Sequence, residues 1–179
     1  MNIGFDLDKV FIDYPPLIPD KLIDKLYKKS SNGKLQYRFP GKPEQFIRKI
    51  SHTSFLRPVI KNNIDFLKSI PKDKNKLYLI SSRFGFLENE TNKVVAREGF
   101  KKIFDGIYFN FSNQEPHIFK DKEINDLKLD KYIDDDFALL KYIAKKNKKT
   151  EFYWLNKKPG KLRLTRNIVA INNISDIFS

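Results

Sequence analysis

The sequence predicts an α/β protein built on a Rossmann-like, three-layer parallel sheet. Short apolar runs alternate with amphipathic segments at helical spacing over most of the 179 residues. Strands joined by helices imply parallel pairing with right-handed crossovers, which gathers the strand C-termini along one edge of the sheet. Several apolar runs end in aspartate or serine, so we expect a functional site at that edge.

The first apolar run and the block that follows it divide the chain into two parts. Ile3–Leu7 is expected to form a buried strand, and three prolines then interrupt the regular pattern. An aspartate N-cap predicts a helix over Asp20–Lys29, apolar alternation predicts a strand over 35–39, and Pro43 begins a second helix. This block, residues 14–56, has the character of an insertion.

The rest of the chain continues the alternation of strands and helices. We therefore predict a core made of residues 1–13 and 57–179, with residues 14–56 as a small, mainly helical cap. Gly99 is expected to close one of the core helices. The remaining predicted elements are helices over 58–70, 88–98, 116–127 and 139–144, and strands over 77–80, 107–109, 132–133, 152–155 and 168–171.

Composition excludes several classes of protein. The absence of cysteine rules out a disulfide scaffold, a zinc-thiolate site and a cysteine nucleophile. No apolar run is long enough to span a bilayer, and the N-terminal segment carries acids where a secretory signal would be basic, so we expect a soluble, cytoplasmic protein.

The net charge of +13 is compatible with a nucleic-acid partner. Only seven of the 35 basic residues are arginine, however, and the chain is also rich in Lys, Ile and Asn. A general compositional bias would raise the charge without creating a binding surface. The charge alone therefore leaves nucleic-acid binding open.

Asp6 and Asp8 follow the first strand at spacing i, i+2. In an extended chain this spacing places both carboxylates on the same side, and a divalent cation is the usual way to offset their repulsion. Ser81 ends a second apolar strand, and Asp134 and Asp135 end a later one. A polar residue after one strand is ordinarily a helix cap, but three such strand ends together indicate a metal-assisted phosphoryl site.

These residues resemble the motifs of the haloacid dehalogenase (HAD) superfamily of aspartate-nucleophile phosphotransferases, in order and over residues 3 to 155. The residue after the second aspartate is commonly glycine in that family, and here it is Lys9. Asp6-Leu7-Asp8-Lys9-Val10 matches the first motif and Ser81 matches the second. For the third motif, a lysine, Lys120 is preferred and Lys122 is the alternative. The fourth motif is matched by Asp134 and Asp135, with Asp136 as a third choice.

The resemblance implies a mechanism as well as a fold. Asp6 would attack phosphorus and form an aspartyl phosphate, while Asp8 would act as general acid and then as general base. Ser81 and Lys120 would bind the phosphoryl oxygens. Mg²⁺ would be held by Asp6, by the backbone carbonyl of Asp8, and by Asp134 or Asp135.

The insertion falls where the family places its most common cap, which restricts access and selects the substrate. The pattern is generally similar to the 5'(3')-deoxyribonucleotidase-like branch, so a nucleotide or another small phosphorylated metabolite is the expected substrate. Alternatives are a phosphatase acting on nucleic-acid termini, and a non-catalytic basic nucleic-acid-binding protein on the same fold. Candidate substrate contacts are Lys9, Ser82, Arg83, Arg38 and Lys42, with Tyr14, Phe39 and Arg48 as further choices.

Three kinds of residue have two interpretations each. His52 and His117 have no clustered partner and are interpreted as ordinary surface or capping histidines. Phe84 and Phe86 are core or lid residues, or they stack on a base. Arg83 either holds a second phosphate or is solvated.

Overall fold

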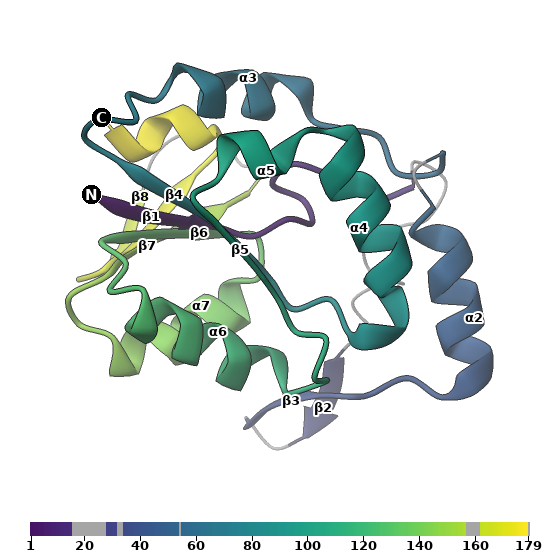
Figure 1. Ribbon diagram of the computed structural model, residues 1–179. Helices are drawn as coiled ribbons and strands as arrows, with labels where there is room; N and C mark the ends of the chain where they lie inside the picture. Colours follow the sequence, from purple (N-terminus) through teal and green to yellow (C-terminus); the bar gives the residue numbers. More distant parts are fainter. Residues whose placement is uncertain (16–27, 32–33, 54, 157–161, 179) are drawn as a thin grey trace.

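The computed structural model describes residues 1–15, 28–31, 34–53, 55–156 and 162–178. Its centre is a seven-stranded sheet with the order β5-β4-β1-β6-β7-β9-β8, parallel except for β8, which runs antiparallel to β9 (Figure 1). The predicted α/β class and parallel sheet are therefore confirmed. The strands are β1 (Asn2–Phe5), β4 (Lys76–Ser81), β5 (Gly106–Phe109), β6 (Lys131–Asp134), β7 (Glu151–Leu155), β8 (Leu162–Thr165) and β9 (Ile168–Ile171).

Helices cover both faces of the sheet (Figure 1). One face packs against α3, α4, α5 and the C-terminal 3₁₀ helix η2, and the other packs against α6 and α7, so that the sheet separates two apolar clusters. The bounds are α3 (Lys61–Ser69), η1 (Gly85–Leu87), α4 (Glu88–Arg97), α5 (Phe100–Ile103), α6 (Pro116–Asp126), α7 (Phe137–Lys146) and η2 (Ile174–Phe178).

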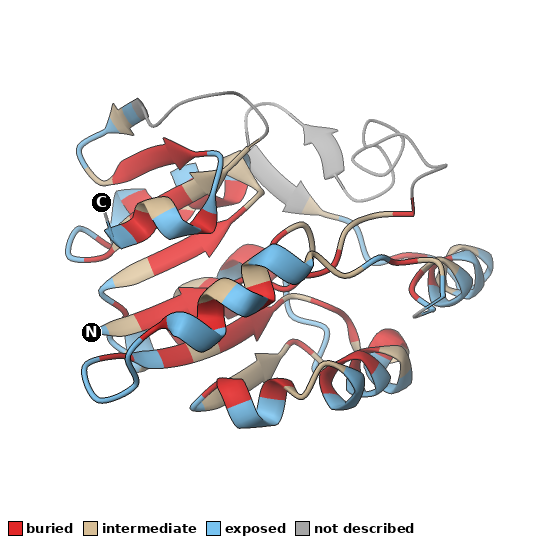
Figure 2. Cartoon of the chain, turned by 90° about the horizontal axis from the view of Figure 1, so that it is seen from above, coloured by how far each residue is buried: buried red, intermediate tan, exposed pale blue. Residues whose placement is uncertain are grey.

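The central strand β1 lies between β4 and β6, with Phe5 level with Leu79 and Ile133. Its apolar residues are buried because both faces of a parallel sheet are covered by helices, as Figure 2 shows. This position brings the residue that follows β1 next to the ends of β4 and β6.

The insertion differs in part from its prediction. Its described residues contain an antiparallel hairpin, β2 (Lys28–Ser31) with β3 (Lys34–Tyr37), and one helix, α2 (Lys42–Ser51). The helix expected over Asp20–Lys29 falls mostly on residues 16–27, outside the described residues, and its last two residues belong to β2 instead. The described part of the insertion is thus a hairpin and a helix rather than mainly helical.

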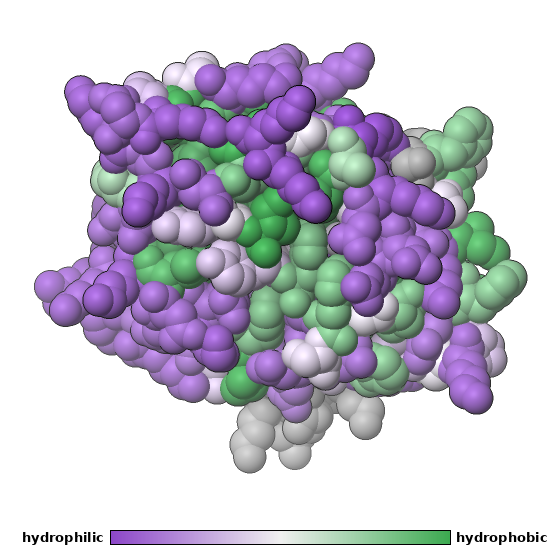
Figure 3. Space-filling view, viewed as in Figure 1, coloured by the Kyte–Doolittle hydropathy of each residue, from purple (hydrophilic) through white to green (hydrophobic). Residues whose placement is uncertain are grey.

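The apolar residues of α2 do not form a core. Phe46 and Ile47 are about two thirds exposed, and Ile50 is about half exposed. In Figure 3, green side chains emerge at the right edge of the molecule, where Figure 1 places α2. The buried face of this helix carries Arg48 instead, beside His52 at its C-cap.

The two chain segments at the ends of the insertion lie side by side. The Asp13 amide donates to the Pro58 carbonyl at 2.8 Å, and the Ile60 amide donates to the Phe11 carbonyl at 2.8 Å. The exact bounds 14–56 remain a prediction. Among the described residues, none of the helices combines the length and apolar character needed to span a bilayer.

Candidate active site

The C-terminal ends of β1, β4 and β6 open into a cavity of about 480 Å³. Asp6, which follows β1, lines it together with Ser81 at the end of β4 and Asp134 at the end of β6. The parallel register of the three strands explains this convergence, because it places their C-termini at the same edge of the sheet. The residues that the first, second and fourth motifs predicted therefore share one site.

Lys120 from α6 joins two of these carboxylates. Its Nζ lies 2.8 Å from Asp6 Oδ1 and 2.6 Å from Asp134 Oδ2, and all three side chains are buried. Asp134 also accepts hydrogen bonds from the Tyr132 hydroxyl at 3.0 Å and from the Asp136 amide at 2.9 Å. Lys122, in contrast, is exposed and contacts Asp126 at 2.7 Å, so the geometry favours Lys120 for the third motif.

Three carboxylates are arranged to hold a metal ion. One oxygen from each of Asp6, Asp134 and Asp135 lies within 4.8 Å of the other two. Hard oxygen donors of this kind suit Mg²⁺. Asp136 also lines the cavity but does not belong to this cluster. It caps α7 by accepting from the Ala138 amide at 3.0 Å, and it accepts a hydrogen bond from the Tyr37 hydroxyl at 2.9 Å.

Charge crowding shifts the pKa of this cluster. Burial, with Asp134 and Asp8 nearby, raises the pKa of Asp6 to about 7 even though Lys120 opposes the rise. Burial, together with the carboxylates of Asp134, Asp6 and Asp136, raises the pKa of Asp135 well above its usual value. Burial would lower the pKa of Lys120, but Asp134 and Asp6 outweigh it and raise that pKa. Lys120 is therefore a permanent cation beside acids that a divalent cation would help to ionise.

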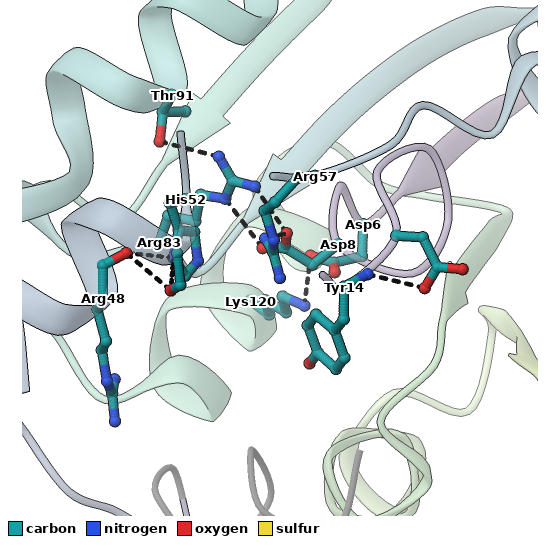
Figure 4. A network of polar contacts seen from close by, with 11 residues as sticks. Asp6, Asp8, Tyr14, Arg48, His52, Arg57, Arg83, Thr91 and Lys120 are labelled. Atoms are coloured by element: carbon teal, nitrogen blue, oxygen red, sulfur yellow. Dashed lines mark hydrogen bonds and ion pairs between the residues drawn. The ribbon is translucent and has the colours of Figure 1, made fainter. Parts of the chain in front are cut away.

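Two arginines hold the Asp8 carboxylate, as Figure 4 shows. Arg83 donates from Nε to Oδ2 at 2.9 Å and from Nη2 to Oδ1 at 2.7 Å, and Arg57 donates to Oδ1 from the opposite end of the insertion. Burial would raise the pKa of Asp8, but the two guanidinium groups outweigh it and hold that pKa far below its usual range. Sequence reasoning missed Arg57, since no local pattern marks it.

The solvated interpretation of Arg83 is wrong. Its side chain is buried, bound to Asp8, and 3.4 Å from the Thr91 hydroxyl of α4. Arg83 also lines the cavity, and its contact with a second phosphate stays a prediction. Ser82 beside it lines the cavity, and its buried Oγ has no hydrogen-bond partner among the described residues. The role of Ser82 as a substrate contact stays a prediction.

Lys9 adopts the left-handed backbone conformation, with φ of +63°. This explains why glycine is common at its position in proteins with the same motif, since glycine reaches positive φ without steric cost. The Lys9 ammonium lies 3.2 Å from Asp13 and 4.2 Å from the centre of the Tyr14 ring. Its side chain lines the cavity as predicted.

The insertion supplies one wall of the cavity. Arg48 of α2, His52 at its C-cap and Tyr37 of β3 line it, together with aromatic side chains of the core. The other predicted contacts of the insertion do not reach the cavity lining: Arg38 pairs with Glu44 at 2.7 Å, and Lys42 is exposed at the start of α2. The core aromatics that line the cavity are Phe84, Phe137 and Trp154, with Tyr14 from the junction between core and insertion.

Phe39 of the insertion packs against two aromatic side chains of the core, Phe84 and Phe86, and these contacts attach the insertion to the core. Phe39 packs against Phe84 at 5.1 Å and against Phe86 at 6.1 Å between ring centres. Phe84 alone among them also lines the cavity. The core-or-lid interpretation of Phe84 and Phe86 is the one that these contacts favour.

The surface interpretation of both histidines is wrong, whereas the capping interpretation is confirmed for His52, the C-cap residue of α2. His52 and His117 are only 4% and 5% exposed. His52 lines the cavity, and His117 stacks on Tyr37 and meets the Tyr142 ring edge-on. No pattern in the sequence predicts the burial of His52 and His117, because it depends on contacts between segments that are far apart in the chain.

Comparison with known proteins supports the fold. No protein-family model and no curated protein matches the chain. Among solved structures, a haloacid dehalogenase-like hydrolase from Streptococcus pneumoniae shares 14% identity with a TM-score of 0.63, over 99% of this chain and 96% of that one. An uncharacterized protein from Listeria monocytogenes gives 14% and 0.56, over 98% and 93%.

A third similar structure is a HAD family enzyme from Bacteroides thetaiotaomicron, solved as an aspartate-to-alanine mutant in complex with magnesium and inorganic phosphate. It shares 17% identity with a TM-score of 0.53, over 89% of this chain and 95% of that one. The chain therefore has the fold of haloacid dehalogenase-like proteins, as its motifs predicted.

Proposed function

We propose that this protein is a Mg²⁺-dependent phosphomonoester hydrolase that acts through an aspartyl phosphate on Asp6. The observation that carries the proposal is the contact of Lys120 with both Asp6 and Asp134 at the end of the sheet, at 2.8 and 2.6 Å. A buried cation beside a buried carboxylate nucleophile provides positive charge where the phosphoryl oxygens gather negative charge.

The chemistry divides one difficult hydrolysis into two displacements. In the first, an Asp6 oxygen attacks phosphorus, the phosphorus–oxygen ester bond breaks, and the leaving alcohol receives a proton by way of Asp8. Because Arg57 and Arg83 hold Asp8 ionised in the free protein, that proton enters with the substrate, bound as the monoanion of the phosphomonoester. In the second, Asp8 takes a proton from water, which attacks phosphorus and releases inorganic phosphate from Asp6. Ser81 and Lys120 orient the phosphoryl oxygens throughout.

Mg²⁺ fits the donor set of the site, and Asp6, Asp134 or Asp135, and the Asp8 carbonyl would hold it. When bound, it would neutralise charge on the transferred phosphoryl group. The magnesium and phosphate in the Bacteroides thetaiotaomicron structure are consistent with this assignment.

A small phosphorylated metabolite, such as a nucleotide, is the substrate class that suits the cavity best. Its volume of about 480 Å³ is in the range of small-molecule sites. Tyr14, Tyr37 and Trp154 provide aromatic surface against which a base could pack. The insertion would select the substrate, because its residues Arg48 and His52 line the cavity.

The deciding experiment is release of phosphate from a generic aryl phosphate with and without Mg²⁺. We expect hydrolysis that requires Mg²⁺ and is abolished by Asp6→Asn. Asp126→Asn is the matched control, because Asp126 is an exposed carboxylate on α6 that pairs with Lys122, away from the cavity. Undiminished hydrolysis by Asp6→Asn would rule out the covalent mechanism.

A phosphatase acting on nucleic-acid ends is the second candidate, and the net charge of +13 favours it. A panel of mononucleotides, sugar phosphates and phosphorylated oligonucleotides separates the two. Higher kcat/KM on oligonucleotide ends, falling steeply with salt, would favour the second candidate. Salt-sensitive DNA binding without phosphate release would indicate the non-catalytic alternative.

A further inference from the structure

His52 occupies an unusual place for a histidine of an insertion. It caps the C-terminal end of α2, is almost fully buried, and lines the same cavity as Asp8 and Arg83 (Figure 4). In the mechanism proposed above, Asp8 exchanges a proton with the leaving alcohol. His52 therefore lies on the side of the cavity that receives the alcohol part of a substrate.

The hydrogen bonds of His52 fix which ring nitrogen carries the proton. Nδ1 lies 2.8 Å from the Arg48 carbonyl oxygen and 3.2 Å from Ser51 Oγ. A carbonyl oxygen can only accept, so Nδ1 is the protonated nitrogen, and the Ser51 hydroxyl donates to the same carbonyl at 3.0 Å. Nε2, on the other side of the ring, carries the lone pair.

The surroundings keep this ring neutral. Burial first, and then the charges of Arg57 and Arg83, lower the pKa of His52 well below its usual value, whereas Asp8 and the Arg48 carbonyl act in the opposite direction. No described residue donates a hydrogen bond to Nε2. A neutral acceptor therefore stands at a cavity wall where its neighbours Arg48 and Arg83 are donors.

We propose that His52 is a specificity-determining residue, whose Nε2 accepts a hydrogen bond from a free hydroxyl on the alcohol part of the substrate, near the ester oxygen. This inference rests on the proposed phosphomonoesterase function and narrows its substrate class to esters of polyols, sugars or nucleosides. A substrate without that hydroxyl leaves a buried acceptor unpaired, and sites built around one hydrogen bond discriminate strongly against the analogue that lacks it.

Two substitutions distinguish the role of Nε2 as an acceptor at the cavity from the structural role of Nδ1, which donates to the Arg48 carbonyl. An asparagine amide reaches about as far as Nδ1, so His52→Asn keeps a donor for the Arg48 carbonyl and removes the acceptor at the cavity. A glutamine amide reaches about as far as Nε2, so His52→Gln restores a polar group with an acceptor at that place. The pair therefore tests the hydrogen bond rather than the fold.

The measurement is kcat/KM, in the presence of Mg²⁺, for glycerol 1-phosphate, for propyl phosphate and for a generic aryl phosphate. We expect the wild-type protein to prefer glycerol 1-phosphate over propyl phosphate by about tenfold or more. His52→Asn should lose most of that preference while it retains aryl phosphatase activity, and His52→Gln should keep at least part of it.

Three results would overturn the inference. The first is equal kcat/KM of the wild-type protein for the two alkyl phosphates, and the second is an unchanged preference in His52→Asn. The third is an equal loss of kcat/KM for all three substrates in both variants, which would make His52 a structural residue. A wild-type protein that hydrolyses none of the three would contradict the proposed function itself. Hydrolysis of the aryl phosphate alone by wild type would contradict only the inference.

Discussion

Arg57 donates a hydrogen bond to the Asp8 carboxylate from a point 49 residues further along the chain. The guanidinium group also lies 4.9 Å from the centre of the Tyr14 ring, and Tyr14 and Arg57 stand at the two ends of the insertion. Arg57 is buried and Asp8 is largely buried. The buried ion pair between Arg57 and Asp8 thus links the C-terminal end of the insertion to the Asp8 side chain.

Arg57→Met should lower the free energy of unfolding by about 1–3 kcal/mol, because Asp8 keeps Arg83 but loses a charged donor. The arginines depress the pKa of Asp8 below its ordinary 3.8, so their stabilisation is complete above that pH and is lost as pH falls through the acidic range. The loss in Arg57→Met should therefore be largest at neutral pH.

Urea unfolding of Arg57→Met at pH 7 and at pH 3 measures this difference. Arg97→Met is the control, since Arg97 is partly exposed and pairs with its neighbour Glu98; its effect should stay within about 0.5 kcal/mol. Equal stability of Arg57→Met and wild type at pH 7 would show that the ion pair does not stabilise the fold.

The sequence predicted the sheet edge well because its signal is local. A strand such as Lys76–Ser81 shows a continuous apolar run that ends in a polar residue, and parallel topology then brings the strand ends together. Lys120 was found through a motif, and α6 places it between Asp6 and Asp134. These features need no knowledge of tertiary contacts.

What the sequence did not predict depends on distant contacts or lacks a periodic signal. Lys28–Ser31 has the sequence KKSS, which shows no apolar alternation. Its residue pattern therefore does not predict the strand that pairs in the hairpin. The four-residue helix Phe100–Ile103 is too short for helical periodicity. Arg57 and His52 acquire their roles only when the insertion packs against the core.

Asp6→Asn should stabilise the metal-free protein. The folded protein raises the pKa of Asp6 from 3.8 to about 7, so ionising this carboxyl costs folding free energy. That cost begins near pH 4, grows as pH rises, and is complete above pH 7, where it is about 4 kcal/mol. Asparagine cannot ionise and escapes it.

Thermal unfolding of wild type and Asp6→Asn in the presence of a chelator, from pH 4.5 to 8.5, measures the effect. The difference in Tm should widen toward alkaline pH. Adding Mg²⁺ should raise the Tm of the wild type more at pH 8 than at pH 5, because binding requires ionised carboxylates. A pH-independent difference between the two proteins would contradict the raised pKa.

Lys120→Met and Lys122→Met form a matched pair on one helix. The buried Lys120 contacts Asp6 and Asp134, and its removal should lower kcat about 100- to 1000-fold, as for other electrostatic contacts with a transferred group. The exposed Lys122 contacts Asp126 and Glu123 at the surface, so its removal should leave kcat within a factor of two. Similar kcat values for the two variants would reject Lys120 as the lysine of the third motif.

Lys9→Gly tests the backbone strain next to the site. With φ of +63°, Lys9 holds a conformation that costs a residue with a Cβ about 1 kcal/mol relative to glycine. The substitution also removes the contacts of the Lys9 side chain with Asp13 and the Tyr14 ring, so wild type is a poor reference. Lys9→Ala loses the same contacts and keeps the Cβ, which makes it the proper one.

We expect Lys9→Gly to be more stable than Lys9→Ala by about 1 kcal/mol in urea unfolding. At a position inside a helix or strand, the glycine variant would be less stable than the alanine variant, because glycine loses more chain entropy on folding. The sign of the difference therefore reports the backbone conformation at this position directly. Greater stability of the alanine variant would mean that the loop after Asp8 does not hold a left-handed residue in solution.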